Sequence, residues 1–459
     1  MHGVRTAVCP PEQETADREE ESGQAVDRGD RPDPARRLRV LLGAYSCSPD
    51  AGSELGVGWH HARAIARHCD VWAIHAPVEA MERWLAEHGE IPSLHFCPLG
   101  YTRFELLLFR TRLLAYLAYT LWQRRAWHLA AKLHDEIHFD LAHQVTLTSY
   151  REPGYLWRLG IPFVWGPVGG VENYPWRFLP RAGLCGAVSE GARAAGNLVQ
   201  LRFGRRIALA ARRAAALITG NSLARAEFEQ QYGVSAIPMN ELGTTSVSAA
   251  SPRTNNRQGA LRMLWSGSFI HKKALHLLLE ALREVPGDCP VELRIVGRGP
   301  LERRWRRQAQ TWGVDHLCRW VPWLPYDEFQ ALYSWADLQV FTSMRDSTGS
   351  VVLEALSHGL PVLCFDHQGC ADMVTPECGV KIPVTRPGET VRRLRETIVS
   401  LARDRSRLDR LSEGALARAG EYLWARKGER IFGIYREVLA EGESAAADAP
   451  PRLEGVPDR

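Results

Sequence analysis

Two blocks of alternating strand-like and helix-like segments dominate the sequence. The N-terminal block has four apolar runs with the length of buried strands, at residues 38–45, 71–75, 139–143 and 161–165, and a helical segment at 59–68. The C-terminal block has matching runs at 261–267, 291–296, 338–342 and 361–365, with helical segments at 274–285 and 301–312. This alternation predicts an α/β protein with two doubly wound, parallel-sheet, Rossmann-like domains facing a cleft.

Chain length and polar segments indicate where the domains end. A chain of 459 residues is too long for one hydrophobic core. Both ends are rich in charged residues and Pro, which is typical of disordered tails. We therefore expect a tail at 1–37, an N-terminal domain at 38–245, a linker at 246–260, a C-terminal domain at 261–420, a helix at 421–440 that packs back on the N-terminal domain, and a tail at 441–459.

The overall charge and the cysteines restrict the partners and the compartment. A net charge of +4 gives no reason to expect nucleic acid as a partner. The ten cysteines contain no Cys-x-x-Cys pair, which favours free thiols in a reducing compartment. The N-terminal tail lacks the apolar stretch of a signal peptide, so we expect a cytoplasmic protein.

Residues 104–127 form the most membrane-like segment. Its apolar and aromatic residues are interrupted by Arg110, Arg112, Arg124 and Arg125, so the segment is not expected to span a bilayer. Two interpretations remain open. The segment is either a basic amphipathic helix that lies on the inner face of an anionic membrane or a core helix whose arginines lie at its edges.

Two carboxylates stand eight positions apart, at Asp346 and Glu354. A helix is predicted from Ser350 to His358, so Asp346 lies on the preceding loop and Glu354 about one turn inside the helix. The free N–H groups at the start of this helix, at Ser350 and Val351, suit a phosphate. Carboxylates accept hydrogen bonds from sugar hydroxyls, so the pattern predicts a pocket for a phosphorylated sugar.

The order of five motifs resembles that of the retaining glycosyltransferases of family four, the bacterial group 1 enzymes with the GT-B fold. The resemblance covers roughly residues 38–439 and rests on these segments: Gly52–Gly58, Trp165–Gly170, Gly267–Leu275, Gly297–Leu301 and Asp346–Glu354. Gly52–Gly58, with Gly56 between them, resembles the family's glycine-rich loop that approaches the donor diphosphate. It implies transfer of a sugar from a nucleoside diphosphate to a hydroxyl of an acceptor glycan, glycolipid or small molecule, with retention of anomeric configuration. It also implies a role in cell-surface polysaccharide or glycoconjugate synthesis.

The resemblance further implies roles for individual residues. Asp346 would contact the donor sugar, Lys273 the phosphates and Glu354 the ribose. The remaining donor-side candidates lie on loops after strands or at a helix start: Gly52, Gly267, Ser268, Lys272, Gly297, Gly299, Ser350 and Val351. The acceptor-side candidates belong to the N-terminal block: Glu54, Gly169, Gly170 and Glu172. His143, at a strand end, is the candidate for the family's catalytic histidine, and a buried core histidine is the alternative.

The sequence departs from the family pattern at two donor-side positions. Asp346 replaces the usual Glu, which shortens its reach by one methylene group, and Ser268 replaces the usual Arg, which removes a phosphate ligand. We expect Lys272 to supply the missing charge beside Lys273. The chain has no Asp-x-Asp pair, so we expect no metal and no cofactor. Two alternatives remain open: a nucleotide-sugar epimerase of the same fold and a catalytically silent sugar-nucleotide-binding protein.

Overall fold

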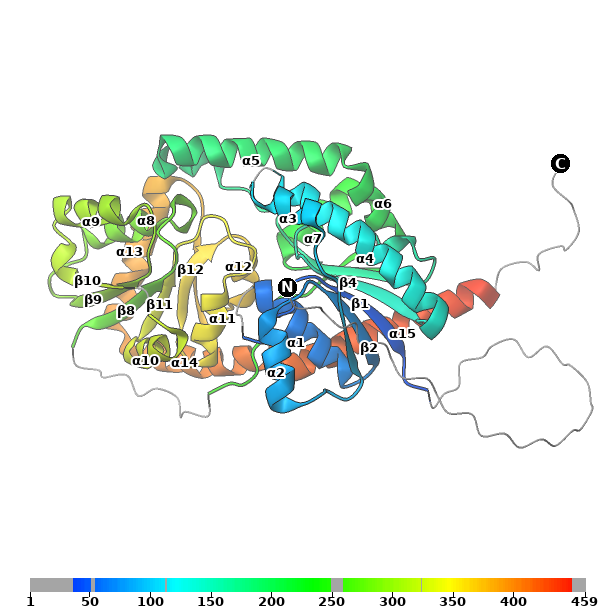
Figure 1. Ribbon diagram of the computed structural model, residues 1–459. Helices are drawn as coiled ribbons and strands as arrows, with labels where there is room; N and C mark the ends of the chain where they lie inside the picture. Colours follow the sequence, from blue (N-terminus) through cyan, green and yellow to red (C-terminus); the bar gives the residue numbers. More distant parts are fainter. Residues whose placement is uncertain (1–35, 51–53, 112–113, 249–258, 323, 448–459) are drawn as a thin grey trace, which may run out of the picture. The chain divides into compact units, whose positions relative to one another are not determined.

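A computed structural model describes residues 36–50, 54–111, 114–248, 259–322 and 324–447 (Figure 1). The residues from Arg37 onward cluster into one unit. Several sequence predictions concern segments outside the described residues: the tail up to residue 35, the linker at 249–258, the tail from residue 448, Gly52 and Arg112.

The N-terminal block is built on a parallel sheet with the strand order β3-β2-β1-β4-β5-β6-β7. Its strands are β1 (Arg39–Ala44), β2 (Asp70–His75), β3 (Leu94–Pro98), β4 (Leu141–Thr146), β5 (Phe163–Val168), β6 (Ala216–Thr219) and β7 (Ala236–Pro238). Its helices are α1 (Glu54–Ala66), α2 (Glu79–His88), α3 (Arg103–Phe109), α4 (Ala115–Ile137), α5 (Leu184–Phe203), α6 (Arg205–Arg213) and α7 (Ser222–Tyr232), with the 3-10 turns η1 (Leu156–Arg158) and η2 (Trp176–Ala182).

The C-terminal block repeats this architecture with the parallel strand order β10-β9-β8-β11-β12-β13. Its strands are β8 (Leu261–Ser266), β9 (Val291–Val296), β10 (Cys318–Val321), β11 (Leu338–Phe341), β12 (Val362–Asp366) and β13 (Gly379–Pro383). Its helices are α8 (Leu275–Leu282), α9 (Glu302–Thr311), α10 (Tyr326–Trp335), α11 (Ser350–Ser357), α12 (Gly369–Met373), α13 (Pro387–Arg403) and α14 (Arg405–Gly420), with the 3-10 turns η3 (His271–Lys273) and η4 (Asp315–Leu317).

The strands are buried on both faces, as expected for parallel sheets. In β1, Val40 and Leu42 enter one apolar core while Leu41, on the opposite face, enters another. This alternation follows from the two-residue period of a strand. Helices therefore have to cover both faces, and the two parallel sheets confirm the predicted fold class.

Each sheet has one point at which the strand order reverses. In the N-terminal block the reversal lies between β1 and β4, and in the C-terminal block it lies between β8 and β11. Open α/β sheets bind ligands outside the carboxyl ends of the strands at such points. The segments that follow β8 and β11 are those that carry Lys272, Lys273 and Asp346.

A long last helix, α15 (Trp424–Ala447), returns to the N-terminal block and packs against α1 (Figure 1). Its residues Ile431 and Ile434 are buried in the same apolar core as Val40 of β1. The contact is close, because a Cβ added to Gly428 would lie 2.5 Å from the backbone oxygen of Ala64. The helix continues to Ala447, so residues 441–447, which were expected to begin a disordered tail, are helical.

The prediction of a glycine-rich loop through Gly58 is wrong. Helix α1 begins at Glu54, so Gly56 and Gly58 lie inside it. The backbone N–H of Gly58 donates to the Ser46 carbonyl at 3.1 Å, and a Cβ at Gly58 would lie 2.2 Å from that oxygen. Gly58 therefore allows α1 to pack closely on the segment after β1.

The basic and apolar segment 104–127 forms parts of two helices, α3 and α4, rather than one. A capping box between Thr102 and Glu105 fixes the start of α3. Helix α4 buries Trp122, while Phe104, Leu107 and other apolar side chains of the segment are exposed. Within the described part of the chain, no helix is long and apolar enough to cross a membrane.

Candidate functional site

The loops that follow β8 and β9 pack directly on each other at the carboxyl ends of these strands. Gly267 donates its backbone N–H to the Val296 carbonyl at 3.0 Å. A Cβ at Gly297 would lie 2.0 Å from the Gly267 carbonyl oxygen, and a Cβ at Gly299 would lie 2.7 Å from that of Phe269. Gly297 and Gly299 are thus required for loop packing, which shapes the segment that leads to η3.

Lys273 and Asp346 form an ion pair at the reversal point between β8 and β11. The Lys273 ammonium also lies 5.0 Å from the centroid of the Phe341 ring. Ser343 donates its hydroxyl to Asp346 Oδ2 at 3.3 Å. Burial alone would raise the pKa of Asp346, but the charges of Lys273 and Lys272 hold that pKa below its usual value. Asp346 is therefore an ionised carboxylate held in place.

Lys272 has no ion-pair partner among the described residues. Burial lowers the pKa of its ammonium, and the charges of Lys273, Arg345 and Arg193 lower it further, against the opposite effect of Asp346. Its backbone carbonyl accepts the Met344 N–H at 2.7 Å, which ties η3 to the loop after β11. Ser268 is exposed. The excess of positive charge around Lys272 is what an anionic ligand would neutralise.

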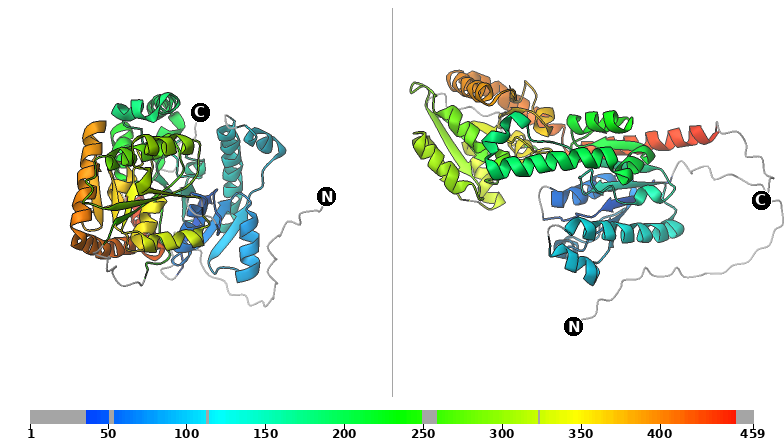
Figure 2. Two further views of the ribbon diagram at one scale, coloured as in Figure 1. Left: turned by 90° about the vertical axis from the view of Figure 1, so that its left-hand side faces the viewer. Right: turned by 90° about the horizontal axis from the view of Figure 1, so that it is seen from above.

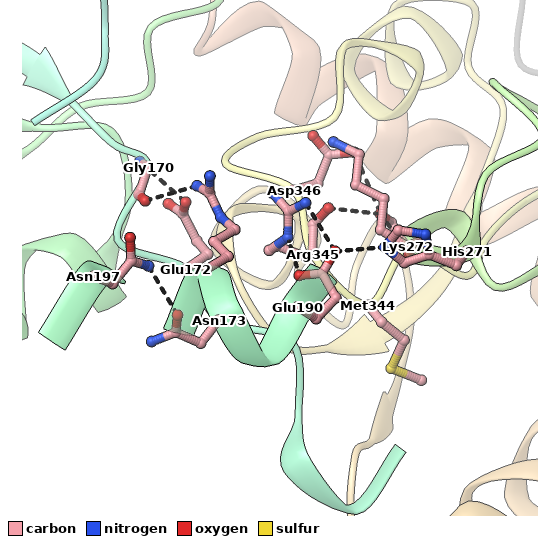
Figure 3. A network of polar contacts seen from close by, with 12 residues as sticks. Gly170, Glu172, Asn173, Glu190, Asn197, His271, Lys272, Met344, Arg345 and Asp346 are labelled. Atoms are coloured by element: carbon pink, nitrogen blue, oxygen red, sulfur yellow. Dashed lines mark hydrogen bonds and ion pairs between the residues drawn. The ribbon is translucent and has the colours of Figure 1, made fainter. Parts of the chain in front are cut away.

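Three residues that the sequence did not identify join this loop to α5. Glu190 of α5 accepts two hydrogen bonds from Arg345, at 2.6 Å and 3.0 Å, and contacts His271 Nε2 at 2.6 Å (Figure 3). Burial alone would raise the pKa of Glu190, but the hydrogen bonds from Arg345 and His271 hold that pKa below its usual value. The fork-like pairing fixes the direction of the Arg345 guanidinium beside Asp346.

The acceptor-side candidates lie against the same loop. Glu172 accepts hydrogen bonds from the Gly170 N–H at 3.0 Å and from the Ser347 hydroxyl at 3.1 Å. A Cβ at Gly169 would lie 3.3 Å from that hydroxyl oxygen. Arg193 of α5 donates to the Gly170 carbonyl at 3.0 Å (Figure 3). The structure thus brings Gly169, Gly170 and Glu172 next to the segment that contains Asp346.

Asn221 completes this junction from the start of α7. Its amide group donates to Glu172 Oε1 at 2.6 Å and to the Ser347 carbonyl at 3.0 Å. Its carbonyl oxygen accepts the Ala224 N–H at 2.8 Å and so caps α7. One side chain therefore connects a helix of the N-terminal block with the loop after β11.

Glu354 lines a cavity of about 620 Å³ that does not include Lys272, Lys273 or Asp346 among its lining residues. The Tyr333 hydroxyl donates to Glu354 Oε2 at 2.8 Å. Burial raises the pKa of Glu354, and the hydrogen bond from Tyr333 only partly offsets this. Ser350 lines the same cavity, and Val351 follows it in the first turn of α11. Gly349 has a positive φ of 82°, which lets the chain turn between the Asp346 loop and α11.

His143 does not belong to this cluster. Its side chain has no exposed surface, and its two ring nitrogens contact the Tyr435 hydroxyl at 2.6 Å and the Gly166 carbonyl at 2.8 Å. Burial lowers its pKa to about 4. Both nitrogens are engaged and no surface faces a ligand, so the structure favours the buried core histidine over the catalytic one.

Glu54 lies at the reversal point of the N-terminal sheet. Its carboxylate accepts hydrogen bonds from the backbone N–H and the hydroxyl of Thr148, both at 3.3 Å. Thr148 follows β4, and its carbonyl accepts the Gly169 N–H at 2.6 Å. Glu54 therefore holds the loop that leads to the acceptor-side glycines.

The side chains of the described residues contain no group of three or more His, Cys, Asp or Glu that could hold a metal ion. Lys272, Lys273 and Arg345 place positive charge on the loops after β8 and β11.

The match to a family model covers the part of the chain that forms this cluster. Residues 248–417 match the model described as glycosyl transferases group 1. This part of the chain is similar to the group 1 glycosyl transferases. The matched segment includes β8–β13, Lys273, Asp346 and Glu354.

Curated relatives show a similarity to glycosyltransferases over part of the chain. The sequence is 28% identical over 214 residues to the D-inositol 3-phosphate glycosyltransferase of Geodermatophilus obscurus, covering 44% of this chain and 46% of the relative. It is 29% identical over 103 residues to the lipopolysaccharide core biosynthesis glycosyltransferase LpsE of Rhizobium meliloti, covering 22% of this chain and 29% of the relative. The chain thus spans less than half the length of these relatives.

Solved structures match over nearly the whole chain. The HepE protein of Anabaena, solved in complex with UDP and glucose, gives a TM-score of 0.55 at 17% identity and covers 89% of this chain and 100% of its own. The sucrose-phosphate synthase of Thermosynechococcus elongatus gives 0.59 at 16% identity, with 88% and 100% covered. These likenesses confirm the predicted GT-B fold.

Proposed function

We propose that the protein is a retaining glycosyltransferase that moves a sugar from a nucleoside diphosphate to a hydroxyl of an acceptor. The proposed setting is the synthesis of a cell-surface polysaccharide or glycoconjugate, in keeping with the relative that acts in lipopolysaccharide core biosynthesis. We place the reaction in the cytoplasm, at the inner face of the membrane.

The observation that carries this proposal is the group of cations at the reversal point between β8 and β11. Lys273 and Arg345 are each held by a carboxylate, whereas the half-buried Lys272 has no ion pair among the described side chains. A diphosphate bound here would neutralise the surplus charge. The same cations would stabilise the negative charge that develops on the leaving nucleoside diphosphate.

The two carboxylates of the motif suit the two ends of a nucleotide sugar. Glu354 lines a cavity of about 620 Å³, within the range of roughly 300–1,000 Å³ that is usual for small-molecule sites. We assign it to the ribose hydroxyls. Asp346 lies beside the lysines, where the donor sugar would follow the phosphates, and we assign it to a hydroxyl of that sugar.

The acceptor would approach from the N-terminal block, where Gly169, Gly170 and Glu172 contact the loop of Asp346. Packing of the two blocks around the donor would exclude water that could hydrolyse it. Retention of configuration then follows from attack on the face of the leaving group, with assistance from that group. We assign no side chain as a nucleophile.

An acceptor-free assay tests this function and separates it from its rivals. A panel of nucleoside diphosphate sugars is incubated with the protein, and the free sugar and free nucleoside diphosphate are measured. We expect slow hydrolysis of one donor, which Lys273→Ala abolishes and Lys132→Ala, a change of an exposed lysine on α4, leaves intact. Nucleotide binding without sugar release would indicate a silent binding protein, and an epimerised product would indicate an epimerase.

A further inference from the structure

Helix α5 exposes an apolar face to solvent. Five large apolar side chains on this helix are between 55% and 82% exposed: Leu184, Val188, Leu198, Val199 and Phe203. Ala192 and Ala195 fill the exposed positions between them. Residues spaced three or four apart lie on one side of a helix, so these side chains form a continuous stripe, which we call the α5 apolar face.

The opposite side of α5 is buried and polar, which is the reverse of an ordinary surface helix. Glu190 and Asn197 are buried there. Glu190 holds Arg345 and His271, and Arg193 contacts Gly170. Up to Leu201, the charged residues of α5 are Glu190 and Arg193. Both contact the site, so neither lies on the α5 apolar face.

The chain segment that contains α5 is strongly basic. Residues 173–226 contain nine arginines and one acidic residue before Glu227, namely the buried Glu190. Five of these arginines are exposed and form no ion pair within the described residues: Arg177, Arg202, Arg205, Arg212 and Arg213. The exposed ring of Trp176 lies next to Arg177, near the other end of the helix from Phe203. An apolar stripe flanked by aromatic rings and arginines is typical of helices that lie in a membrane interface.

Helix α5 runs along the outside of the structure, at the top of Figure 1 and across the right-hand view of Figure 2. Just before it, Tyr174 and Phe178 are buried in the core of the C-terminal block, while Leu201 near its end is buried in the core of the N-terminal block. The helix thus contacts both blocks, and a flat surface could meet it along its length of roughly 30 Å.

We propose that the α5 apolar face and its arginines bind the surface of an anionic phospholipid bilayer. A second copy of the chain is a poorer occupant, because a symmetric contact places the same patch on both partners. The unpaired arginines of the two copies would then lie opposite one another and repel. Anionic head groups instead complement these charges, while the acyl boundary accepts the leucine, valine and aromatic side chains.

The position of this surface also indicates the chemical class of the acceptor, an inference that rests on the proposed function. The diameter of a helix, roughly 10 Å, separates the α5 apolar face from Glu190 and the Arg345 loop. A bilayer on the outer side of α5 would therefore bring head groups close to the site. We infer that the acceptor is a lipid-linked glycan or glycolipid rather than a free metabolite.

Vesicle sedimentation tests the surface independently of activity. The full chain is mixed at low salt with vesicles of phosphatidylcholine containing phosphatidylglycerol, and with vesicles of phosphatidylcholine alone. We expect binding to the anionic vesicles only, falling as salt is added. Replacing Leu198, Val199 and Phe203 together by Gln should weaken binding more than tenfold. Each Arg→Gln change at Arg202 or Arg205 should weaken it about fivefold.

A matched change on the other basic and apolar segment gives the control. Leu106→Gln with Leu107→Gln alters exposed side chains of α3 and should leave vesicle binding within about twofold of the unaltered protein. Nucleotide affinity should be unchanged in all these variants, which shows that each is folded. The proposal is overturned if the unaltered protein ignores anionic vesicles, if only the α3 change releases it, or if the α5 changes convert a dimer to a monomer without affecting vesicle binding. Sugar transfer without vesicle binding would overturn this surface and leave the proposed function standing.

Discussion

Asp346 and Glu354 belong to one motif but lie in opposite electrostatic environments. Asp346 is paired with Lys273, and the pKa of its carboxyl is held below the usual value although burial acts in the other direction. Glu354 accepts a hydrogen bond from the neutral Tyr333 hydroxyl, and burial raises its pKa. The difference indicates that the protein itself neutralises the charge of Asp346. The ionised form of Glu354, in contrast, would be stabilised by a ligand that supplies hydrogen-bond donors.

The spacing of two carboxylates in the sequence does not by itself determine the role of each. Gly349 turns the chain between the two residues, so that one faces the loop after β8 and the other faces the cavity next to α10. A nucleotide sugar has a charged centre and a hydroxyl-rich end on each side. Under the proposed function, Asp346 would contact the sugar and Glu354 the ribose of such a ligand, on either side of its phosphates.

The largest effect is expected when the cation beside Asp346 is removed. Lys273→Ala should lower turnover roughly 10²–10³-fold, as observed when one preorganised donor to a developing negative charge is lost. Initial rates of sugar transfer measure this, with Lys132→Ala as the control. Equal turnover in both variants would mean that the phosphates lie elsewhere.

The next effect concerns the other carboxylate. Glu354→Gln should weaken nucleoside diphosphate binding by about ten- to a hundredfold, because charged hydrogen bonds contribute about 1.5–3 kcal/mol. Calorimetric titration measures the affinity, and Glu396→Gln on the exposed part of α13 is a matched control. An unchanged affinity in Glu354→Gln would remove the ribose from this cavity.

A smaller effect should show whether Lys272 replaces the family's missing arginine. Lys272→Ala should weaken diphosphate binding about tenfold, in the range of a single charged hydrogen bond. Adding Ser268→Arg to this variant should restore most of the affinity, because a guanidinium then returns to the usual position. If the added arginine has no effect while Lys272→Ala weakens binding, the two side chains do not face the same phosphate.

The two carboxylates should affect the pH dependence of the free energy of unfolding in opposite directions. The depressed pKa of Asp346 means that its ionised form stabilises the fold above the unfolded value of about 3.9 and that this contribution is lost as the pH falls through the lower folded value. Asp346→Asn should therefore destabilise the protein at pH 7 by roughly 1–2 kcal/mol, with a smaller difference in acid.

The raised pKa of Glu354 predicts that its ionised form destabilises the fold. Its ionised form opposes folding above the unfolded value of about 4.3, so Glu354→Gln should stabilise the free protein increasingly as the pH rises through the folded value. Urea unfolding of both variants from about pH 2 to pH 8 covers both titrations and measures these trends. The same sign for both variants would contradict the two environments.

No effect is expected from a chelator. Turnover in EDTA should equal that in buffer, since the lysines and Arg345 would supply the positive charge. Loss of turnover that magnesium or manganese restores would show that the charge balance around Asp346 includes an ion.

Much of the fold follows from local sequence, whereas part of the site does not. The run 291–296 forms β9 as predicted, and α11 begins at Ser350 as expected, because strand length and a preceding glycine are local signals. The bond between Glu190 and Arg345 joins residues 155 positions apart and leaves no local pattern. The one available signal was Glu190 itself, a single acid within a basic and apolar helix.

The glycines show a different limit. Gly56 and Gly58 were expected in a phosphate-binding loop, yet they lie inside α1, where Gly58 permits close packing against Ser46. A glycine pattern records a close approach of the backbone but does not say whether a ligand or another segment approaches. The positions Gly297 and Gly299 illustrate the same point, because their neighbours are backbone atoms of the β8 loop.

Binding of nucleoside diphosphates by the Lys272–Lys273 pair decides whether the donor phosphates lie between β8 and β11. Titration calorimetry compares the unaltered protein, the double variant Lys272→Ala with Lys273→Ala, and Lys132→Ala, using the nucleoside diphosphate that binds best. We expect the double variant to lose at least about a hundredfold in affinity and Lys132→Ala to lose none. Equal affinity in all three proteins would contradict the placement of the diphosphate between β8 and β11.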